Sequence, residues 1–224
     1  MTFLGVDALL LSAWLSARSI ARDLPMPVPE YGGFRVDTNS KDEIARWVFP
    51  KAQPYLARLA QTISEPGYLL KLCGSADELA ALLPVQWTLH PPGYFMQSTS
   101  EPAAGRLAVG YQIRVERYGV VTHAQIFCNS GELAADGYAV ETTDVFIYDR
   151  IVTRPEHRRK GLAQVLMKKL YAARQLDCGP QVLVATEAGR VLYTALGWDT
   201  VSPYSTASLA GPESAFGVRH IAGE

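Results

Sequence analysis

The stretch from Val145 to Leu176 reads VFIYDRIVTRPEHRRKGLAQVLMKKLYAARQL, and the rest of the chain is organised around it. Its first part, Val145 to Val152, is short and rich in β-branched and aromatic residues, which predicts a largely buried strand. Apolar residues then recur at helical spacing from Leu162 to Ala173, which predicts an amphipathic helix packed on a sheet. Between strand and helix lie Arg158, Arg159, Lys160, Gly161, Leu162 and Ala163.

A basic loop that opens a helix after a strand suits the binding of phosphate groups. The first amides of a helix have no intrahelical acceptor, and the helix dipole is positive at that end. Gly161 and the small Ala163 would let a pyrophosphate approach the backbone, while Arg158, Arg159 and Lys160 add positive charge. A solvated basic turn is the alternative for such a triplet. The preceding strand and the following helix favour the phosphate site.

These residues resemble the acyl-CoA signature of the GNAT (Gcn5-related N-acetyltransferase) superfamily. Val152, Pro155 and Arg158 to Ala163 are similar to its valine and proline ahead of Q/R-x-x-G-x-G/A. A second block, TEAGRVLYTALGW from Thr186 to Trp198, looks like the family's next helix with its LYxxLGF/W ending. The resemblance covers roughly the second half of the chain. It implies an α/β (α+β) GNAT fold, in which helices flank a mixed, mostly antiparallel central sheet.

The resemblance also implies which residues contact acetyl-CoA, the expected co-substrate. In the family, the strand before the signature splays from the next strand, and pantetheine adds along the gap through backbone hydrogen bonds. Thr186 and Gly189 stand where the family often has Asn and Ala, and a threonine hydroxyl could replace the usual hydrogen bond. The predicted cofactor contacts are Ile151, Val152, Thr153, Arg158, Arg159, Lys160, Gly161, Leu162, Ala163, Thr186 and Gly189.

Tyr193 matches the tyrosine with which many family members protonate the departing thiolate of CoA. A phenol with a pKa near ~10 can donate to a thiolate derived from a thiol with a pKa near ~8.5. The alternative is a helix tyrosine with its ring in the core and its hydroxyl at the surface. The match to the second block favours the catalytic role.

Asp149 is the first candidate for the base that deprotonates the attacking amine. Strand alternation puts it on the same face as Ile147 and Ile151. The alternative is an ion pair with a neighbour such as Arg150 or Arg154. Glu141 and Asp144, just before the strand, are weaker candidates for the base and are predicted instead to bind the ammonium group of the substrate.

Composition limits the class of partner. The chain has 224 residues, of which 48% are hydrophobic, and 21 Lys and Arg against 22 Asp and Glu give a net charge of -1. This balance gives no reason to expect nucleic acid or a membrane surface, and the default location is cytoplasmic. The scattered Cys73, Cys128 and Cys178 show no metal spacing, and His90, His123, His157 and His220 form no cluster, so no metal is predicted.

The N-terminal part lacks a motif of its own. Apolar residues from Val6 to Ile20 recur at helical spacing and predict an amphipathic helix rather than an export signal. A helical apolar face is expected from Ile44 to Ile63. A soft boundary near residue 100 separates a helix-rich region, 1–100, from the predicted GNAT core, 101–224. The first region could be a substrate-capping lobe, a decayed second GNAT unit, or helices woven into one domain.

The sequence and the resemblance therefore predict a GNAT-type N-acetyltransferase that carries acetyl from acetyl-CoA to a primary amine, with a small molecule as the favoured acceptor and protein N-termini or lysines as the alternatives. Direct attack, without a metal or a covalent enzyme intermediate, is the expected route. A non-catalytic acyl-CoA-binding sensor or scaffold of the same fold is the alternative from another class. The family also makes a homodimer possible.

Overall fold

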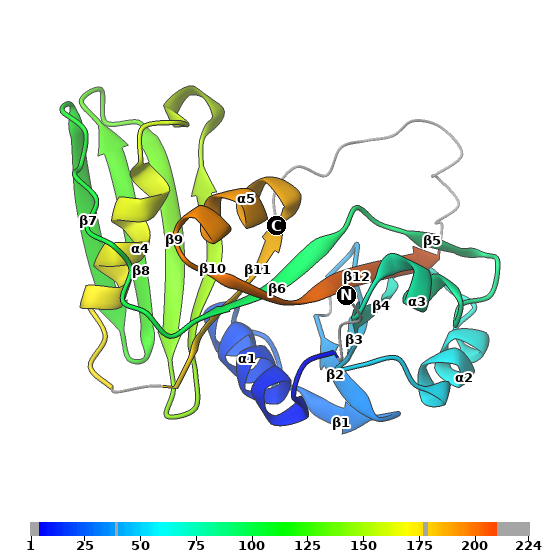
Figure 1. Cartoon of the computed structure of the whole chain (residues 1–224). Coiled ribbons are helices and arrows are strands. Elements are labelled where there is room, and N and C mark those ends of the chain that lie inside the picture. Colours follow the sequence, from blue (N-terminus) through cyan, green and yellow to red (C-terminus); the bar gives the residue numbers. More distant parts are fainter. Residues whose placement is uncertain (1–4, 39, 177–178, 210–224) are drawn as a thin grey trace.

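The computed structural model describes residues 5–38, 40–176 and 179–209, and Cys178 and His220 lie outside these ranges (Figure 1). The helices are α1 (Ala8–Ala21), α2 (Pro54–Thr62), α3 (Ala76–Ala80), η1 (Pro155–His157, a 3-10 turn), α4 (Leu162–Ala172) and α5 (Glu187–Ala195). The strands are β1 (Val28–Glu30), β2 (Gly33–Asp37), β3 (Ala45–Phe49), β4 (Tyr68–Cys73), β5 (Trp87–Leu89), β6 (Gly93–Ser98), β7 (Tyr111–Tyr118), β8 (Val121–Cys128), β9 (Leu133–Glu141), β10 (Phe146–Thr153), β11 (Gln181–Thr186) and β12 (Asp199–Leu209).

All these strands join one mixed sheet in the order β1-β2-β3-β4-β12-β6-β11-β10-β9-β8-β7, and β5 also pairs with β12. The strands from β7 to β10 form an antiparallel meander, and β10 and β11 are parallel and joined through α4. The meander, the strand around residues 145–152 and the helix after the basic loop were predicted from the sequence. The predicted α/β class with a mixed central sheet is confirmed.

The same strand–helix–strand connection between two parallel strands occurs in both halves of the chain. β3 and β4 are parallel and joined through α2, just as β10 and β11 are joined through α4. Each pair is completed by a strand from the other half: β4 pairs with β12, and β11 pairs with β6. β6 and β12 pair with each other at the middle of the sheet. Strands from before and after the predicted boundary near residue 100 therefore form one continuous sheet.

Three apolar clusters hold the layers together. α1 covers one face of the sheet, where Trp14 packs with Phe95 and Tyr204 and the cluster extends to strands of both halves. On the opposite face, α4 and α5 share a cluster with β8 to β11. α2 and α3 pack there over β3, β4 and β12. Among the described residues, no helix is both long and apolar enough to cross a bilayer.

The sequence-based prediction for the segment after Ile44 is wrong in its first part. Ala45–Phe49 is a strand with every residue buried, and the helix begins at Pro54. Ala45, Trp47 and Phe49 pack in one cluster and Val48 in the cluster on the other face. Because both faces of this strand are buried, its apolar residues Trp47, Val48 and Phe49 are consecutive, and a consecutive run does not distinguish a strand from a helix.

Candidate active site

β10 and β11 separate soon after they begin. They pair in parallel at Phe146 with Gln181 and at Ile147 with Val182. Beyond these pairs, β10 keeps β9 on one edge and β11 keeps β6 on its far edge, and no described strand joins their facing edges. We call this opening the fork. Unpaired main-chain groups along two strand edges can form hydrogen bonds with an extended ligand.

A β-bulge reshapes β10 at the fork. The pairing with β9 shifts between Asp149 and Val152, and Arg150 adopts a left-handed φ of 53°. Before the bulge, Ile147 packs in the α1 cluster and Asp149 bonds to α1. After the bulge, Ile151 packs against the α4 cluster. The predicted alternation that placed Ile151 on the same face as Asp149 is therefore wrong. The extra residue in the bulge makes the side chains after it point to the opposite face of the sheet.

The basic loop follows the open end of β10. Arg158, Arg159, Lys160 and Gly161 are exposed, whereas Leu162 is buried and anchors the start of α4. Gly161 is the N-cap residue with a left-handed φ of 71°, and no side chain caps the helix there. The first amides of α4 thus keep their capacity to bind an acceptor.

Two contacts attach this loop to the sheet. The Nε of Arg158 donates to the carbonyl oxygen of Thr153 at 3.3 Å. The Nζ of Lys160 donates to the hydroxyl of Tyr111 in β7 at 2.7 Å. The predicted contacts from residues 151–153 and 158–163 therefore lie next to one another, along the open end of β10 and around the start of α4.

The other side of the fork ends in α5. Thr186 is the last residue of β11 and caps α5, because its hydroxyl accepts a hydrogen bond from the Gly189 amide at 3.3 Å. A Cβ on Gly189 would lie 3.3 Å from the Cβ of Ala185 and 3.4 Å from Cε2 of Tyr193. Thr186 and Gly189 thus lie at the open end of β11, close to the predicted catalytic tyrosine.

Tyr193 lies in the apolar cluster beside the fork, with 7% of its surface exposed. The ring of Trp198 lies 5.9 Å from that of Tyr193 and 5.7 Å from that of Tyr148 in β10. Burial raises the pKa of the Tyr193 hydroxyl, since the phenolate would lose its hydration. The group stays protonated around neutral pH, as a proton donor must.

Asp149 is tied to arginines. Arg22 of α1 donates from Nε and Nη2 to the two carboxylate oxygens at 2.8 and 3.0 Å, and Arg150 donates from Nε at 3.1 Å. The Nε of Arg18 lies 3.8 Å away. Burial opposes ionisation, but the hydrogen bond from Arg22 and the three positive charges outweigh it and lower the pKa of Asp149. A carboxylate held in this way is a weak proton acceptor, so the geometry favours the ion-pair alternative.

We expect Asp149→Asn to lower the free energy of unfolding by about 3 kcal/mol at pH 7, because buried guanidinium groups would lose their counter-charge. The folded-state pKa lies below the unfolded value of about 3.9, so the stabilisation is fully present above that value and is lost as the pH falls through the folded pKa. Urea unfolding at pH 7 and near pH 3 should show the difference between variant and wild type shrinking in acid. Asp199→Asn, at an exposed position, is the control. An equally large loss at both pH values would contradict the ion-pair role.

Glu141 and Asp144 lie at the other end of β10. Glu141 ends β9 and is 1% exposed; it accepts hydrogen bonds from Arg117 and from the amides of Gln175 and Leu176. Asp144 is exposed in the turn before β10. At about 3.3 Å per residue, Asp144 is roughly 30 Å from Thr153, the end of β10 that leads to the basic loop. These two carboxylates therefore lie near the closed end of the fork and far from the basic loop, and the protein hydrogen bonds to Glu141 occupy its carboxylate.

Sequence reasoning missed Arg18 and Arg22, which hold Asp149. Both lie in the last turn and cap of α1, more than a hundred positions before the carboxylate. Their spacing of four residues puts them on one side of the helix, which was the available signal. Their partner depends on how α1 docks on the sheet, and no local pattern encodes that.

At this site a parallel strand pair opens beside a basic helix start, and a buried tyrosine lies on the next helix. The family model "Acetyltransferase (GNAT) domain" matches residues 116–200, from β7 to the start of β12. This part of the chain is a GNAT acetyltransferase domain, as the resemblance in sequence implied.

Solved structures agree on the fold. A GCN5-related N-acetyltransferase from Kribbella flavida is 14% identical, with a TM-score of 0.64 over 95% of this chain and 98% of that one. A putative GNAT-family acetyltransferase from Novosphingobium aromaticivorans is 19% identical, with a TM-score of 0.54 over 92% and 98%. A tandem GNAT protein from the clavulanic acid biosynthesis pathway is 14% identical, with a TM-score of 0.52 over 75% and 76%. No curated protein matches the sequence significantly.

Proposed function

We propose that the protein transfers an acetyl group from acetyl-CoA to a primary amine of a small molecule. The observation that carries this proposal is the fork, because its unpaired strand edges lead from an exposed basic loop to a buried tyrosine. The pyrophosphate of CoA would bind at the uncapped start of α4, with Arg158, Arg159 and Lys160 near its charges. Pantetheine would then extend along Ile151, Val152 and Thr153.

The proposed reaction uses the groups that line the fork between the basic loop and Tyr193. The amine nitrogen attacks the thioester carbonyl, and main-chain amides of β10 at the fork stabilise the negative charge on its oxygen. A C–N bond forms and the C–S bond breaks. Tyr193 gives its proton to the departing thiolate and regains one from the amine, which loses a proton in the reaction. Because Asp149 is held by arginines, we assign the proton relay from the amine to water at the fork.

The role of Asp149 can be separated from its effect on folding. If water carries the amine proton, Asp149→Asn should keep the shape of the wild-type pH profile of kcat/KM, even where its overall activity is lower. If Asp149 is the base that the sequence predicted, the acidic limb of the profile should disappear in the variant. The profiles should be recorded at a temperature at which circular dichroism shows both proteins folded.

The proposal is tested with acetyl-CoA and a panel of small amines that includes diamines, amino sugars and amino acids. Release of the CoA thiol, measured with a thiol reagent, and the mass of the acetylated product report turnover. We expect amine-dependent thiol release with at least one acceptor. Acetyl-CoA binding without turnover on any amine would favour the sensor alternative. Folded protein that does not bind acetyl-CoA would overturn the proposal.

A further inference from the structure

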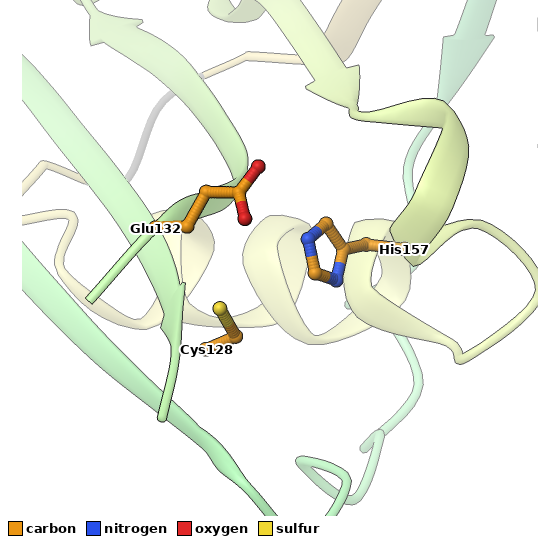
Figure 2. A group of neighbouring side chains, drawn as sticks. All are labelled: Cys128, Glu132 and His157. Carbon is orange, nitrogen blue, oxygen red and sulfur yellow. The ribbon is translucent and has the colours of Figure 1, made fainter. Parts of the chain in front are cut away.

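Three side chains with metal-binding chemistry converge beside the basic loop (Figure 2). Cys128 ends β8, Glu132 lies in the turn before β9, and His157 ends η1, just before the loop. The Cys128 sulfur, a Glu132 carboxylate oxygen and a His157 ring nitrogen all lie within 4.8 Å of one another. In the described part of the chain, no hydrogen bond or ion pair joins any two of these side chains. The Cys128 sulfur lies 3.0 Å from the Ser130 hydroxyl, but the three side chains form no bonds with one another.

The His157 ring is already oriented for a ligand. Its side chain is largely buried, with 9% of the residue exposed, and its Nδ1 lies 2.8 Å from the hydroxyl of Tyr111. Figure 2 shows a ring nitrogen directed toward Glu132 and Cys128, and this nitrogen is Nε2 because Nδ1 contacts Tyr111. A hydroxyl oxygen has two lone pairs, so Tyr111 can accept from both Lys160 and the Nδ1–H of His157. That tautomer leaves a lone pair on Nε2. A metal-binding histidine commonly has such a partner on its other nitrogen.

We propose that Cys128, Glu132 and His157 bind a zinc ion, with water as the fourth ligand. Thiolate, imidazole and carboxylate are all zinc ligands, whereas Mg²⁺ and Ca²⁺ require oxygen ligands throughout. Zinc–ligand bonds of about 2.0–2.3 Å put neighbouring tetrahedral ligands about 3.3–3.8 Å apart. The three atoms would need to move by about 1 Å or less, and Glu132 is exposed and can rotate.

The proposed ion would connect two parts of the fold. It would fix the β8–β9 turn to η1 and, through the contact of His157 with Tyr111, reach the Lys160 side chain of the basic loop. The site is separate from the fork, so it can be present or absent whatever the outcome for the proposed function. The sequence predicted no metal here because His157 is 25 positions beyond Glu132 and no short spacing joins the three ligands.

Cobalt(II) titration of the full-length, chelator-treated protein tests the site. We expect one Co²⁺ per chain to give a thiolate-to-cobalt charge-transfer band and the intense visible absorption of tetrahedral cobalt, both removed by added zinc. Cys128→Ser should lose the charge-transfer band. Glu132→Gln, at an exposed position, and His157→Gln should each weaken cobalt binding by about tenfold or more.

Two matched variants serve as controls. Cys73→Ala removes a buried free thiol and His90→Gln removes an exposed imidazole. Both residues lie in the N-terminal half of the chain, and both variants should keep the wild-type spectrum. Circular dichroism establishes that each variant is folded. Two results would overturn the proposal: saturating cobalt that gives no charge-transfer band with wild type, or a band that persists in folded Cys128→Ser.

Discussion

Tyr193→Phe is expected to lower kcat by about 10²- to 10³-fold and to leave the affinity for acetyl-CoA within about twofold. Phenylalanine keeps the ring that packs beside Trp198, so the fork should keep its shape. What is lost is the proton for the departing thiolate. Because burial raises the pKa of the Tyr193 hydroxyl, wild-type activity should continue through the pH at which an exposed tyrosine would ionise, about 10.

Tyr171→Phe is the matched control for this experiment. Tyr171 is also a largely buried tyrosine, but it lies on α4, against Phe146 and Arg174. Its loss should change kcat by less than about twofold. Steady-state kinetics gives kcat, and calorimetry with acetyl-CoA gives the affinity. Unchanged turnover in Tyr193→Phe would remove this residue from the mechanism and leave it as a core tyrosine.

Gly161→Glu is expected to weaken acetyl-CoA binding by about 100-fold or more. The new carboxylate would lie at the positive end of α4, where it would compete with the pyrophosphate for the backbone amides and add repulsion. A Cβ at Gly161 meets no atom within 4 Å, so the variant should fold, although the left-handed φ of 71° costs about 1–2 kcal/mol for a residue with a Cβ.

Gly119→Glu is the control that distinguishes the effect of a carboxylate at the start of α4 from the effect of backbone strain. Gly119 has a φ of 61° in the turn between β7 and β8, and its Cβ would also point into open space. It therefore adds the same charge in a similarly strained conformation, away from the basic loop. Calorimetric titration should give wild-type affinity for Gly119→Glu and little or no binding for Gly161→Glu. Equal affinities in the two variants would show that the start of α4 does not hold the cofactor.

The part of the site that could be predicted from the sequence is the part encoded locally. The strand, the basic loop and the helix follow one another between Val145 and Leu176, so their spacing specifies the open end of β10. The block around Tyr193 is equally compact. Asp149 illustrates the limit, since its environment comes from α1 and from a bulge at Arg150 that alternation of side chains cannot reveal.

The N-terminal half shows a second limit. Residues 28–73 repeat the order of an antiparallel meander followed by a parallel crossover, and this favours the decayed second unit among the three alternatives. The parallel pair there stays closed, because β3 pairs with β4 from Ala45 with Tyr68 through Phe49 with Leu72. No basic loop precedes α2, which begins at Pro54 with Gln53 as its N-cap residue. The exchange of β6 and β12 between halves involves main-chain pairing, which side-chain patterns do not encode.

This strand exchange has a consequence for how the protein is made. The core of the N-terminal half contains Ala207 and Leu209 from β12, the last strand described, which pairs with β4. A ribosome delivers those residues more than a hundred positions after β4, so we expect the N-terminal half to wait, with its strand edge exposed, until β12 has emerged. The two halves should therefore acquire their native structure together, in a single cooperative step after β12 is made, rather than unit by unit as the chain emerges.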